Sequence, residues 1–202
     1  MASGKVFSNK IKYKKLPTGT VLLDEIKQFL ADGKYILGIC NGFQMLVRMG
    51  LLPDTQGVVQ PEATLAKNNS GKFEDRWVYC KVNPAVKTPF LKDMDVVALP
   101  VRHGEGKLLF LDEQTRATAQ AQGLNCLSYV GADGQPADGY PHNPNGAELH
   151  CAGLTNKTGQ VFGLMPHPEA YLSLYNHPKW GQLLRQDQQR TEEGEGLKIL
   201  TN

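Results

Sequence analysis

A short apolar run that ends in a cysteine between two glycines is the feature that most constrains this chain. Residues 35–39 read Tyr-Ile-Leu-Gly-Ile, which favours a strand buried on both faces. Directly after it, apolar residues recur at helical spacing until Gly50 ends the pattern, at Phe43, Leu46, Val47 and Met49. A buried strand joined to a helix by a sharp turn is typical of a parallel α/β sheet.

The rest of the chain predicts a helix before this unit and several strands after it. The helix carries its apolar face between Thr20, the expected cap, and Gly33, the expected terminator. Four apolar runs predict further strands, at residues 77–82, 95–101, 125–130 and 161–165. Residues 131–146 are mostly Gly, Pro, Asp, Asn and Ala, which predicts a long irregular loop. We expect a polar helix at residues 183–190 and a frayed end over the last twelve residues.

Composition and charge exclude several classes of protein. Lys and Arg total 22 and Asp and Glu total 20, so nothing favours binding to nucleic acid or to an acidic membrane surface. The four cysteines form no CxxC pair, and we expect neither a disulfide scaffold nor a metal site. No apolar run reaches the roughly 20 residues that span a bilayer, and the basic N-terminus has no signal-peptide core. We therefore expect a single domain over residues 1–202, located in a reducing cytoplasm.

Cys40 stands between Gly38 and Gly42, where the predicted strand meets the predicted helix. A nucleophile on such a turn is exposed at the carboxyl edge of the strand, as in the nucleophile elbow of hydrolases. The positive end of the following helix favours a thiolate, and its N–H groups can hold an oxyanion. The alternative is that Cys40 is a small buried apolar side chain, as most free cysteines are.

A thiol nucleophile needs a base, and the base needs an orienting partner. His167 follows an apolar strand and lies between Pro166 and Pro168, which stiffen the turn. Glu169 stands two residues further on, so in an extended segment its side chain projects to the same side as the imidazole. The alternative is a rigid surface turn with a solvated carboxylate.

Together these motifs carry a family resemblance. Residues 38–46 (GICNGFQML) and 163–169 (GLMPHPE) resemble the class I glutamine amidotransferases. The HGEG segment at residues 103–106 and the NPNG segment at 143–146 are similar to the glutaminase subunits of phosphoribosylformylglycinamidine synthases. The stretch from Asn69 to Phe73, which leads to Arg76-Trp77, is similar to those subunits as well. The resemblance extends from about residue 3 to about residue 180.

The resemblance implies roles for particular residues. It implies a catalytic triad, in chain order, of Cys40, His167 and Glu169. It further implies that the glutamine substrate is enclosed by Gln44, His103, Gly104 and Glu105. The amide N–H of Asn41 is implied to be one half of an oxyanion hole, whose other half comes from a glycine upstream in the family.

The fold implied by the resemblance is a three-layer α/β/α, flavodoxin-like domain with a mostly parallel central sheet. The family normally opens with strands and helices that precede the segment beginning at Met1. We therefore expect the N-terminal strands to be absent, which leaves the strand at 35–39 with an unpaired edge.

The implied activity is hydrolysis of glutamine to glutamate and ammonia through a glutamyl thioester. The ammonia would pass to a large, ATP-dependent synthase subunit in de novo purine synthesis, with a small accessory subunit as a further component. ATP and Mg²⁺ are expected only on that partner, and no cofactor in this chain.

Two other functions remain open from the sequence. The chain could be another cysteine hydrolase or peptidase of the same architecture. It could also be a docking module that contacts the synthase without hydrolysing glutamine. The presence of all three triad residues argues against the docking module, and the missing N-terminal strands argue for it.

Overall fold

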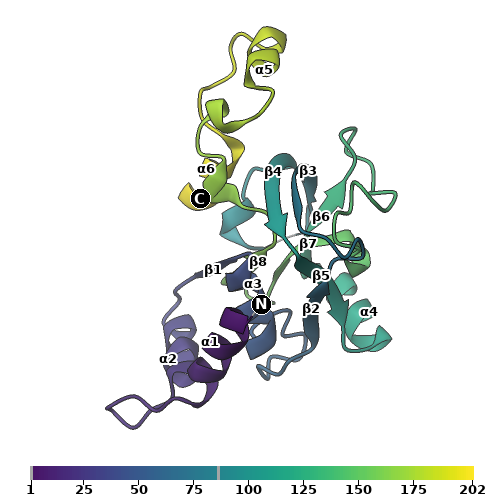
Figure 1. Cartoon of the computed structure of the whole chain (residues 1–202). Helices are drawn as coiled ribbons and strands as arrows, with labels where there is room; N and C mark the ends of the chain where they lie inside the picture. The colour runs from purple at the N-terminus through teal and green to yellow at the C-terminus, as the bar shows by residue number, and fades with distance from the viewer. Residues whose placement is uncertain (1, 86) are drawn as a thin grey trace.

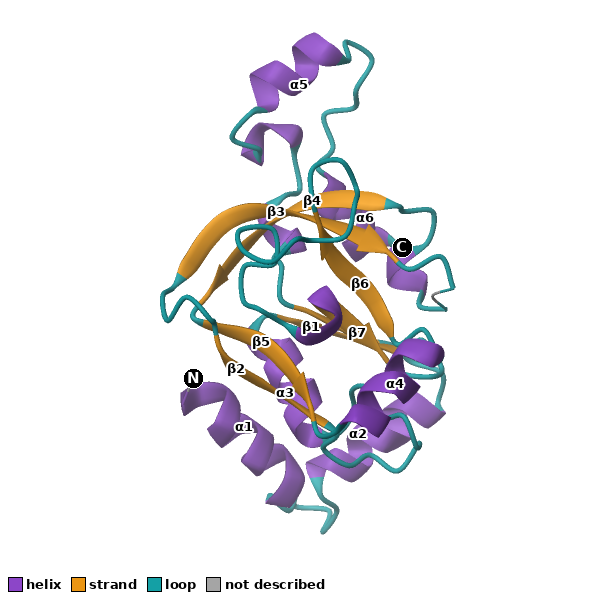
Figure 2. Ribbon diagram, turned by 90° about the vertical axis from the view of Figure 1, so that its right-hand side faces the viewer, coloured by secondary structure: helices purple, strands orange, loops and turns teal. Residues whose placement is uncertain are grey.

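Six strands form one sheet at the centre of the molecule, and two further strands form a small second sheet (Figure 2). The computed structural model describes residues 2–85 and 87–202, so Met1 and Val86 of the predicted 1–202 domain lie outside the described residues. The strands are β1 (Ile36–Ile39), β2 (Ala63–Lys67), β3 (Glu74–Val82), β4 (Val96–His103), β5 (Glu105–Phe110), β6 (Asn125–Val130), β7 (Cys151–Thr155) and β8 (Val161–Leu164).

The helices lie at the two ends of the molecule as drawn in Figure 1 and beside the sheet. The α-helices are α1 (Ala2–Tyr13), α2 (Leu22–Ala31), α3 (Asn41–Met49), α4 (Glu113–Ala121), α5 (Trp180–Gln186) and α6 (Glu195–Thr201). Short 3₁₀ turns are η1 (Pro89–Leu91), η2 (Glu148–His150), η3 (Pro168–Ala170) and η4 (Leu174–Asn176). No helix in the described part of the chain is both long and apolar enough to cross a membrane.

The α/β class is as predicted, but the expectation of a mostly parallel sheet is not met by the described strands. The central sheet has the order β1-β8-β7-β6-β3-β4, and only β1 and β8 run parallel. The physical reason is the length of the connections. Residues 156–160 alone join β7 to β8, whereas a parallel pair needs a crossover of about a dozen residues or more.

β1 is an edge strand rather than a strand covered on both sides. Among the described residues it pairs only with β8, which matches the predicted unpaired edge. Ile36, Leu37 and Ile39 are half-buried, so the prediction of burial on both faces is wrong. An apolar run shows that the side chains of a strand are hydrophobic, but it does not show how many other strands pair with it.

Two apolar cores lie on the two faces of the central sheet. In β8, Phe162 and Leu164 belong to one core, which also contains Ile199 of α6 and Leu91 of η1. Val161 on the opposite face of β8 belongs to the other core, which α3 supplies with buried residues, namely Phe43, Leu46, Val47 and Met49. The sheet is therefore sandwiched, with α1 and α3 on one face and α6 on the other.

A pair of glycines lets α3 approach the sheet closely. Gly38 of β1 and Gly163 of β8 lie directly opposite each other in the parallel pair. A Cβ atom on Gly38 would lie 2.4 Å from Leu46 Cδ1, and one on Gly163 would lie 2.3 Å from Phe43 Cδ2. Both distances are far below contact, so only glycine permits α3 to lie where it does. We call Gly38 and Gly163 the glycine floor.

The helix ends show one correct and one wrong prediction of capping. The residue before α2 is Val21, which makes no side-chain cap, so Thr20 is not the cap. The Thr20 hydroxyl instead donates to the Glu25 carboxylate at 2.7 Å. Gly33 follows α2 with a φ of +78° and donates its N–H to Leu30 O, as predicted for a terminator.

The last part of the chain is more ordered than the sequence predicted. The polar helix lies at Trp180–Gln186, earlier than the predicted 183–190, and it projects away from the sheet (Figure 1). The predicted frayed end contains α6, whose Ile199 is fully buried and whose Glu195 carboxylate accepts from the Ala98 N–H at 2.7 Å. A helix this short gains its stability from tertiary packing, which its own sequence does not reveal.

We expect Gly163→Ala to lower the free energy of unfolding by about 1–3 kcal/mol, because the new methyl group would overlap Phe43 and push α3 off the glycine floor. Thermal unfolding followed by circular dichroism measures the effect. The matched control is Gly181→Ala in α5, where the nearest neighbour is the flexible end of Arg185 at 3.7 Å. The control should be neutral or slightly stabilising, and equal losses in both variants would contradict the role of the floor.

Candidate active site

Cys40 occupies the turn between β1 and α3 in a rare backbone conformation. Its φ is +51° and its ψ is −102°, which is strained for any residue that carries a side chain. Its N–H donates to Leu164 O at 2.8 Å, which ties the turn to the end of β8. Strain of this kind costs about 1–3 kcal/mol and is concentrated at functional sites. The turn therefore presents the sulfur at the carboxyl edge of the sheet.

His167 reaches the same edge because β8 runs parallel to β1. The chain leaves β8, and the His167 N–H donates to Pro100 O at 2.8 Å, which fixes the turn against β4. The imidazole Nδ1 lies 2.5 Å from Glu169 Oε1. Its Nε2 is buried and makes no hydrogen bond with the described residues, which leaves this nitrogen for the nearby Cys40 side chain.

The surroundings of His167 favour its charged form. The neighbouring Cys40 side chain is the main cause of the raised pKa of His167, which is about 9. Partial burial acts in the opposite direction, and the Glu169 carboxylate adds to the rise. The imidazole is thus protonated at neutral pH, with its charge between a sulfur and a carboxylate. The structure brings together the three residues predicted as a triad.

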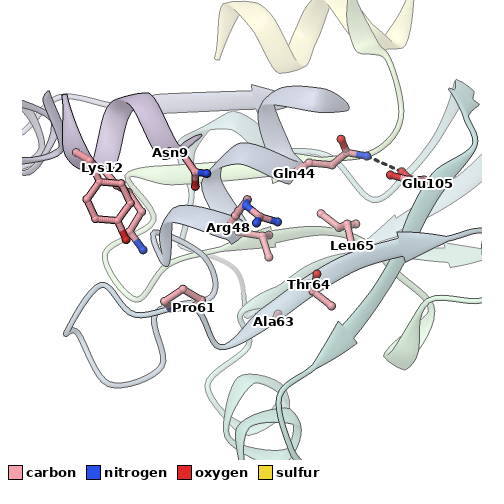
Figure 3. A pocket seen from close by; sticks show the side chains of 11 residues that line it. Asn9, Lys12, Gln44, Arg48, Pro61, Ala63, Thr64, Leu65 and Glu105 are labelled. Carbon is pink, nitrogen blue, oxygen red and sulfur yellow. Dashed lines mark hydrogen bonds between the residues drawn. The ribbon is translucent and has the colours of Figure 1, made fainter. Parts of the chain in front are cut away.

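The corner between β4 and β5 lies against the first turns of α3. The Cys40 Sγ is 3.9 Å from the carbonyl oxygen of Arg102. Gln44, one turn along α3 from Cys40, donates its Nε2 to Glu105 O at 2.7 Å (Figure 3). Residues four apart on a helix share a face, so the thiol and the amide look toward the same corner. We call residues 102–105 the catalytic corner.

A cavity of about 590 Å³ opens beside Gln44 and Glu105. It lies between α1, α3 and β2, and Figure 3 shows Arg48 and Gln44 pointing into it from α3. Lys12 contributes a second cationic side chain to the wall. The cavity therefore lies one helical turn along α3 from Cys40, and its wall combines the cationic side chains with amide groups and Glu105.

The side chain of His103 does not line this cavity, and the part of the turn at residues 103–105 in enclosing the substrate stays a prediction. His103 is 2% exposed, because the alternation along β4 directs it inward with Val97, Leu99 and Val101. Burial, followed by the charge on His167, lowers the pKa of His103 to about 4. The imidazole is therefore neutral. Gly104 contributes a carbonyl that accepts from the Asn68 N–H at 3.0 Å.

Asn41 is the first residue of α3, and its position fits the oxyanion role that the resemblance implied. The first N–H groups of a helix have no acceptor within the helix and can bind an anion. The Asn41 Oδ1 is buried and makes no hydrogen bond with the described residues. Its role stays a prediction.

Two groups at the site were missed by the sequence analysis. The Arg102 carbonyl carries no sequence signal, because any residue has one. Asn68 contacts the catalytic corner, and the pair Asn68-Asn69 before a Ser-Gly turn was the available signal. In the described part of the chain, no group of three or more His, Cys, Asp or Glu side chains is arranged to hold a metal ion.

Comparison with known proteins gives one family along the whole chain. Residues 1–202 match the model of a CobB/CobQ-like glutamine amidotransferase domain. "Phosphoribosylformylglycinamidine synthase subunit PurQ" of Dehalococcoides mccartyi is 40% identical over 203 residues, covering 100% of this chain and 72% of the relative. The protein with the same description in Methanococcus maripaludis is 41% identical over 181 residues, covering 88% of this chain and 63% of the relative.

Longer proteins and a solved structure show the same likeness. "Phosphoribosylformylglycinamidine synthase" of Drosophila melanogaster is 38% identical over 148 residues, which cover 71% of this chain and 11% of the relative. A solved structure described as "Structure of PurLQS from Thermotoga maritima" matches with a TM-score of 0.56 and 31% identity. That match covers 82% of this chain and 66% of the matched chain.

We expect iodoacetamide to modify Cys40 well before the other cysteines. Cys80, Cys126 and Cys151 are fully buried, and burial raises the pKa of each of these thiols. Cys40 is only half-buried and lies beside the His167 imidazole. Peptide mapping by mass spectrometry after brief alkylation measures the order. Equal modification of Cys40 and Cys126 would contradict the assignment of a reactive thiol.

We expect Glu169→Gln to lower the pH at which His167 titrates. The carboxylate helps to raise the pKa of His167 to about 9, so a neutral amide in its place should bring the midpoint down. NMR titration of the imidazole signals measures this midpoint in both proteins. The control is Glu113→Gln, whose carboxylate pairs with Arg116 on α4. A midpoint unchanged in Glu169→Gln would rule out the electrostatic role of Glu169.

Proposed function

The chain belongs to the CobB/CobQ-like glutamine amidotransferase family, and on this premise we propose that it is the glutaminase component of a phosphoribosylformylglycinamidine synthase. The observation that carries the activity is the strained turn that sets Cys40 beside the His167–Glu169 pair. The particular synthase is supported by the names of relatives near 40% identity. The chain spans 72% and 63% of the length of those two relatives, so the activity of the whole protein is part of the proposal.

The reaction would begin with the Cys40 thiolate attacking the side-chain amide carbon of glutamine. The protonated His167 would give its proton to the departing nitrogen, so that ammonia leaves and a glutamyl thioester remains on Cys40. The neutral His167 would then take a proton from water, and the hydroxide would hydrolyse the thioester to glutamate and restore the thiol. Glu169 would hold the imidazole in the orientation that both steps need.

Binding of glutamine would use the cavity beside Gln44 and Glu105. A substrate whose amide carbon lies at Cys40 would extend its amino-acid end along α3 toward Gln44 and Arg48. The cations of Arg48 and Lys12 suit a carboxylate at that end. The Asn41 N–H would stabilise the oxyanion that forms on the amide oxygen.

The ammonia would pass to a larger, ATP-dependent synthase subunit, and ATP and Mg²⁺ would act on that partner. The word "subunit" in the relatives' names supports a complex. The absence of a phosphate-binding loop motif from the sequence supports placing ATP elsewhere. A small accessory subunit would be a further component.

The loop at residues 131–146 would supply part of the contact with the synthase. The second half of this loop is held inside the protein, because Asn143 and Asn145 are buried and hydrogen-bonded. Tyr140 is 60% exposed and lies against Arg76. The exposed residues 138–142 are therefore available to a partner, as are the exposed residues 132, 133, 135 and 136 in the first half of the loop.

We expect the protein to release glutamate from glutamine, and Cys40→Ala to reduce the rate by about 10³-fold or more. Loss of one sulfur at a half-exposed turn should leave the melting temperature nearly unchanged. A coupled glutamate assay, with and without the large subunit of a relative, measures the activity. Cys126→Ala is the control for loss of a thiol far from His167.

Two outcomes of that assay would contradict the proposal. Hydrolysis of peptides without glutamine turnover would favour another cysteine hydrolase. Stable binding to the large subunit with no glutamate release under any condition would favour a docking module.

A further inference from the structure

Asn68, which follows β2, holds the catalytic corner through three hydrogen bonds. Its backbone N–H donates to Gly104 O at 3.0 Å, and its Nδ2 donates to His103 O at 2.8 Å. Its Oδ1 lies 3.1 Å from His103 Nδ1. Asn68 is 3% exposed, so each of these bonds lies away from water. One side chain thus binds both the main chain and the imidazole of the corner.

The hydrogen bonds also determine where the proton of His103 resides. The Asn68 Nδ2 donates a second bond, to Lys72 O at 3.0 Å, so this end of the amide is fixed as the donor. Its Oδ1 must then accept, and His103 Nδ1 must carry the hydrogen. The lone pair of His103 remains on Nε2, which is buried and makes no hydrogen bond with the described residues. His103 is therefore held as one neutral tautomer.

Charged groups face His103 from two neighbouring elements. His167, just before η3, opposes a positive charge on His103, and Glu74, its register partner on β3, favours one. The Glu74 carboxylate is already engaged, because it pairs with Arg76 and accepts from Ser70. Burial is the main cause that lowers the pKa of His103, and Asn68 adds no charge that would oppose it, because it offers the ring a neutral amide oxygen.

The other side of the same corner contacts Cys40, the proposed nucleophile, and Gln44, which lines the cavity. Arg102 O lies against Cys40 Sγ, and Glu105 O accepts from Gln44. The corner is a short segment, residues 102–105. The hydrogen bonds from Asn68 on one side and the contacts with Cys40 and Gln44 on the other side therefore hold the same few residues. A displacement of the corner would reach Cys40 and Gln44 together.

The motifs that marked the resemblance meet behind this corner. Asn69 donates its N–H to Asn145 O at 3.1 Å, which joins the segment after β2 to the NPNG segment. A Cβ on Gly106 would lie 2.9 Å from both Asn145 Nδ2 and His103 Nδ1, so all three segments are in contact. Asn145 continues the network to the hydroxyl of buried Tyr129.

We propose that Asn68 is a positioning residue for the glutaminase reaction: it sets the catalytic corner against Cys40 and Gln44 and holds His103 in one tautomer. The inference rests on the proposed function for its kinetic consequence. Asn68 touches neither the thiol nor the cavity, and it acts through the corner. Neither the resemblance nor the comparisons assigned it a role.

The test uses the full chain with Asn68→Asp, which keeps the shape and the acceptor but removes the donor to His103 O and Lys72 O. A carboxylate beside His103 Nδ1 should raise the midpoint of His103 from about 4 to 6.5 or above, measured by NMR titration. In the glutamate assay, kcat/KM at pH 7 should fall about 10- to 100-fold, as for a misplaced catalytic group. The loss should deepen as the pH falls, because a charged His103 then opposes His167.

The matched control is Asn125→Asp, which makes the same chemical change at an amide that bonds Leu149 O and Ser128 instead of the corner. It should leave the His103 midpoint and kcat/KM as in the unchanged protein. If Asn68→Asp does not fold, Asn68→Ser replaces it, with the same loss of kcat/KM and with His103 no longer held as one tautomer, which the nitrogen NMR shifts of its ring report.

The inference is overturned if the folded Asn68 variant lowers only the melting temperature, with the His103 midpoint and kcat/KM matching those of the control. If the unchanged protein hydrolyses no glutamine, the proposed function fails. The NMR titration still decides whether Asn68 controls His103. A raised midpoint then supports the structural part of the inference, and an unchanged midpoint refutes it.

Discussion

The close approach of α3 to the glycine floor is the constraint on which the rest of the structure depends. Gly38 and Gly163 offer no side chain, so Phe43 and Leu46 descend into the space that their Cβ atoms would fill. Cys40 joins the end of β1 to the start of α3 and has a positive φ. Its sulfur is therefore carried next to a helix whose position is set by apolar packing.

Two histidines near the sulfur show how the same fold produces opposite chemistry. His167 lies on a turn where a thiol and a carboxylate approach it, and these contacts outweigh partial burial and raise its pKa. His103 lies at the end of β4, where burial dominates and lowers its pKa. One positive charge is therefore stable at this edge of the sheet, and a second is opposed. The polarity of the site is fixed before any substrate enters.

The sequence predicted well those features that depend on neighbouring residues. The strand at residues 125–130 and the end of α3 at Gly50 have the predicted bounds because periodicity and a terminating glycine are local signals. It missed β2, β5 and β7, which are short or rich in small and polar residues. Strand direction also escaped it, since connection lengths matter only once all the strands are known.

The residues of the candidate site also divide into those that a short motif reveals and those that it does not. Cys40 and His167 could be found because each lies within a distinctive short motif, and the parallel pairing of β1 and β8 brings the two together. Asn68 could not be assigned, because its contacts with His103 cross 35 positions of the chain. The inward direction of His103 follows from its alternation with Val97, Leu99 and Val101, a pattern that extends past the predicted end of that strand at residue 101.

The packing of α6 under η3 has a consequence for the order in which the protein is made. η3 begins at Pro168, directly after His167, and α6 is the helix that packs against it. Glu195, the first residue of α6, also bonds β4 near Pro100, the residue that holds the His167 N–H. On a translating ribosome, the Cys40 turn must therefore wait for β8, to which its N–H is bonded, and the histidine turn must wait for α6 as well. The two halves of the site settle late and nearly together, only after residues 195–201 have emerged from the exit tunnel.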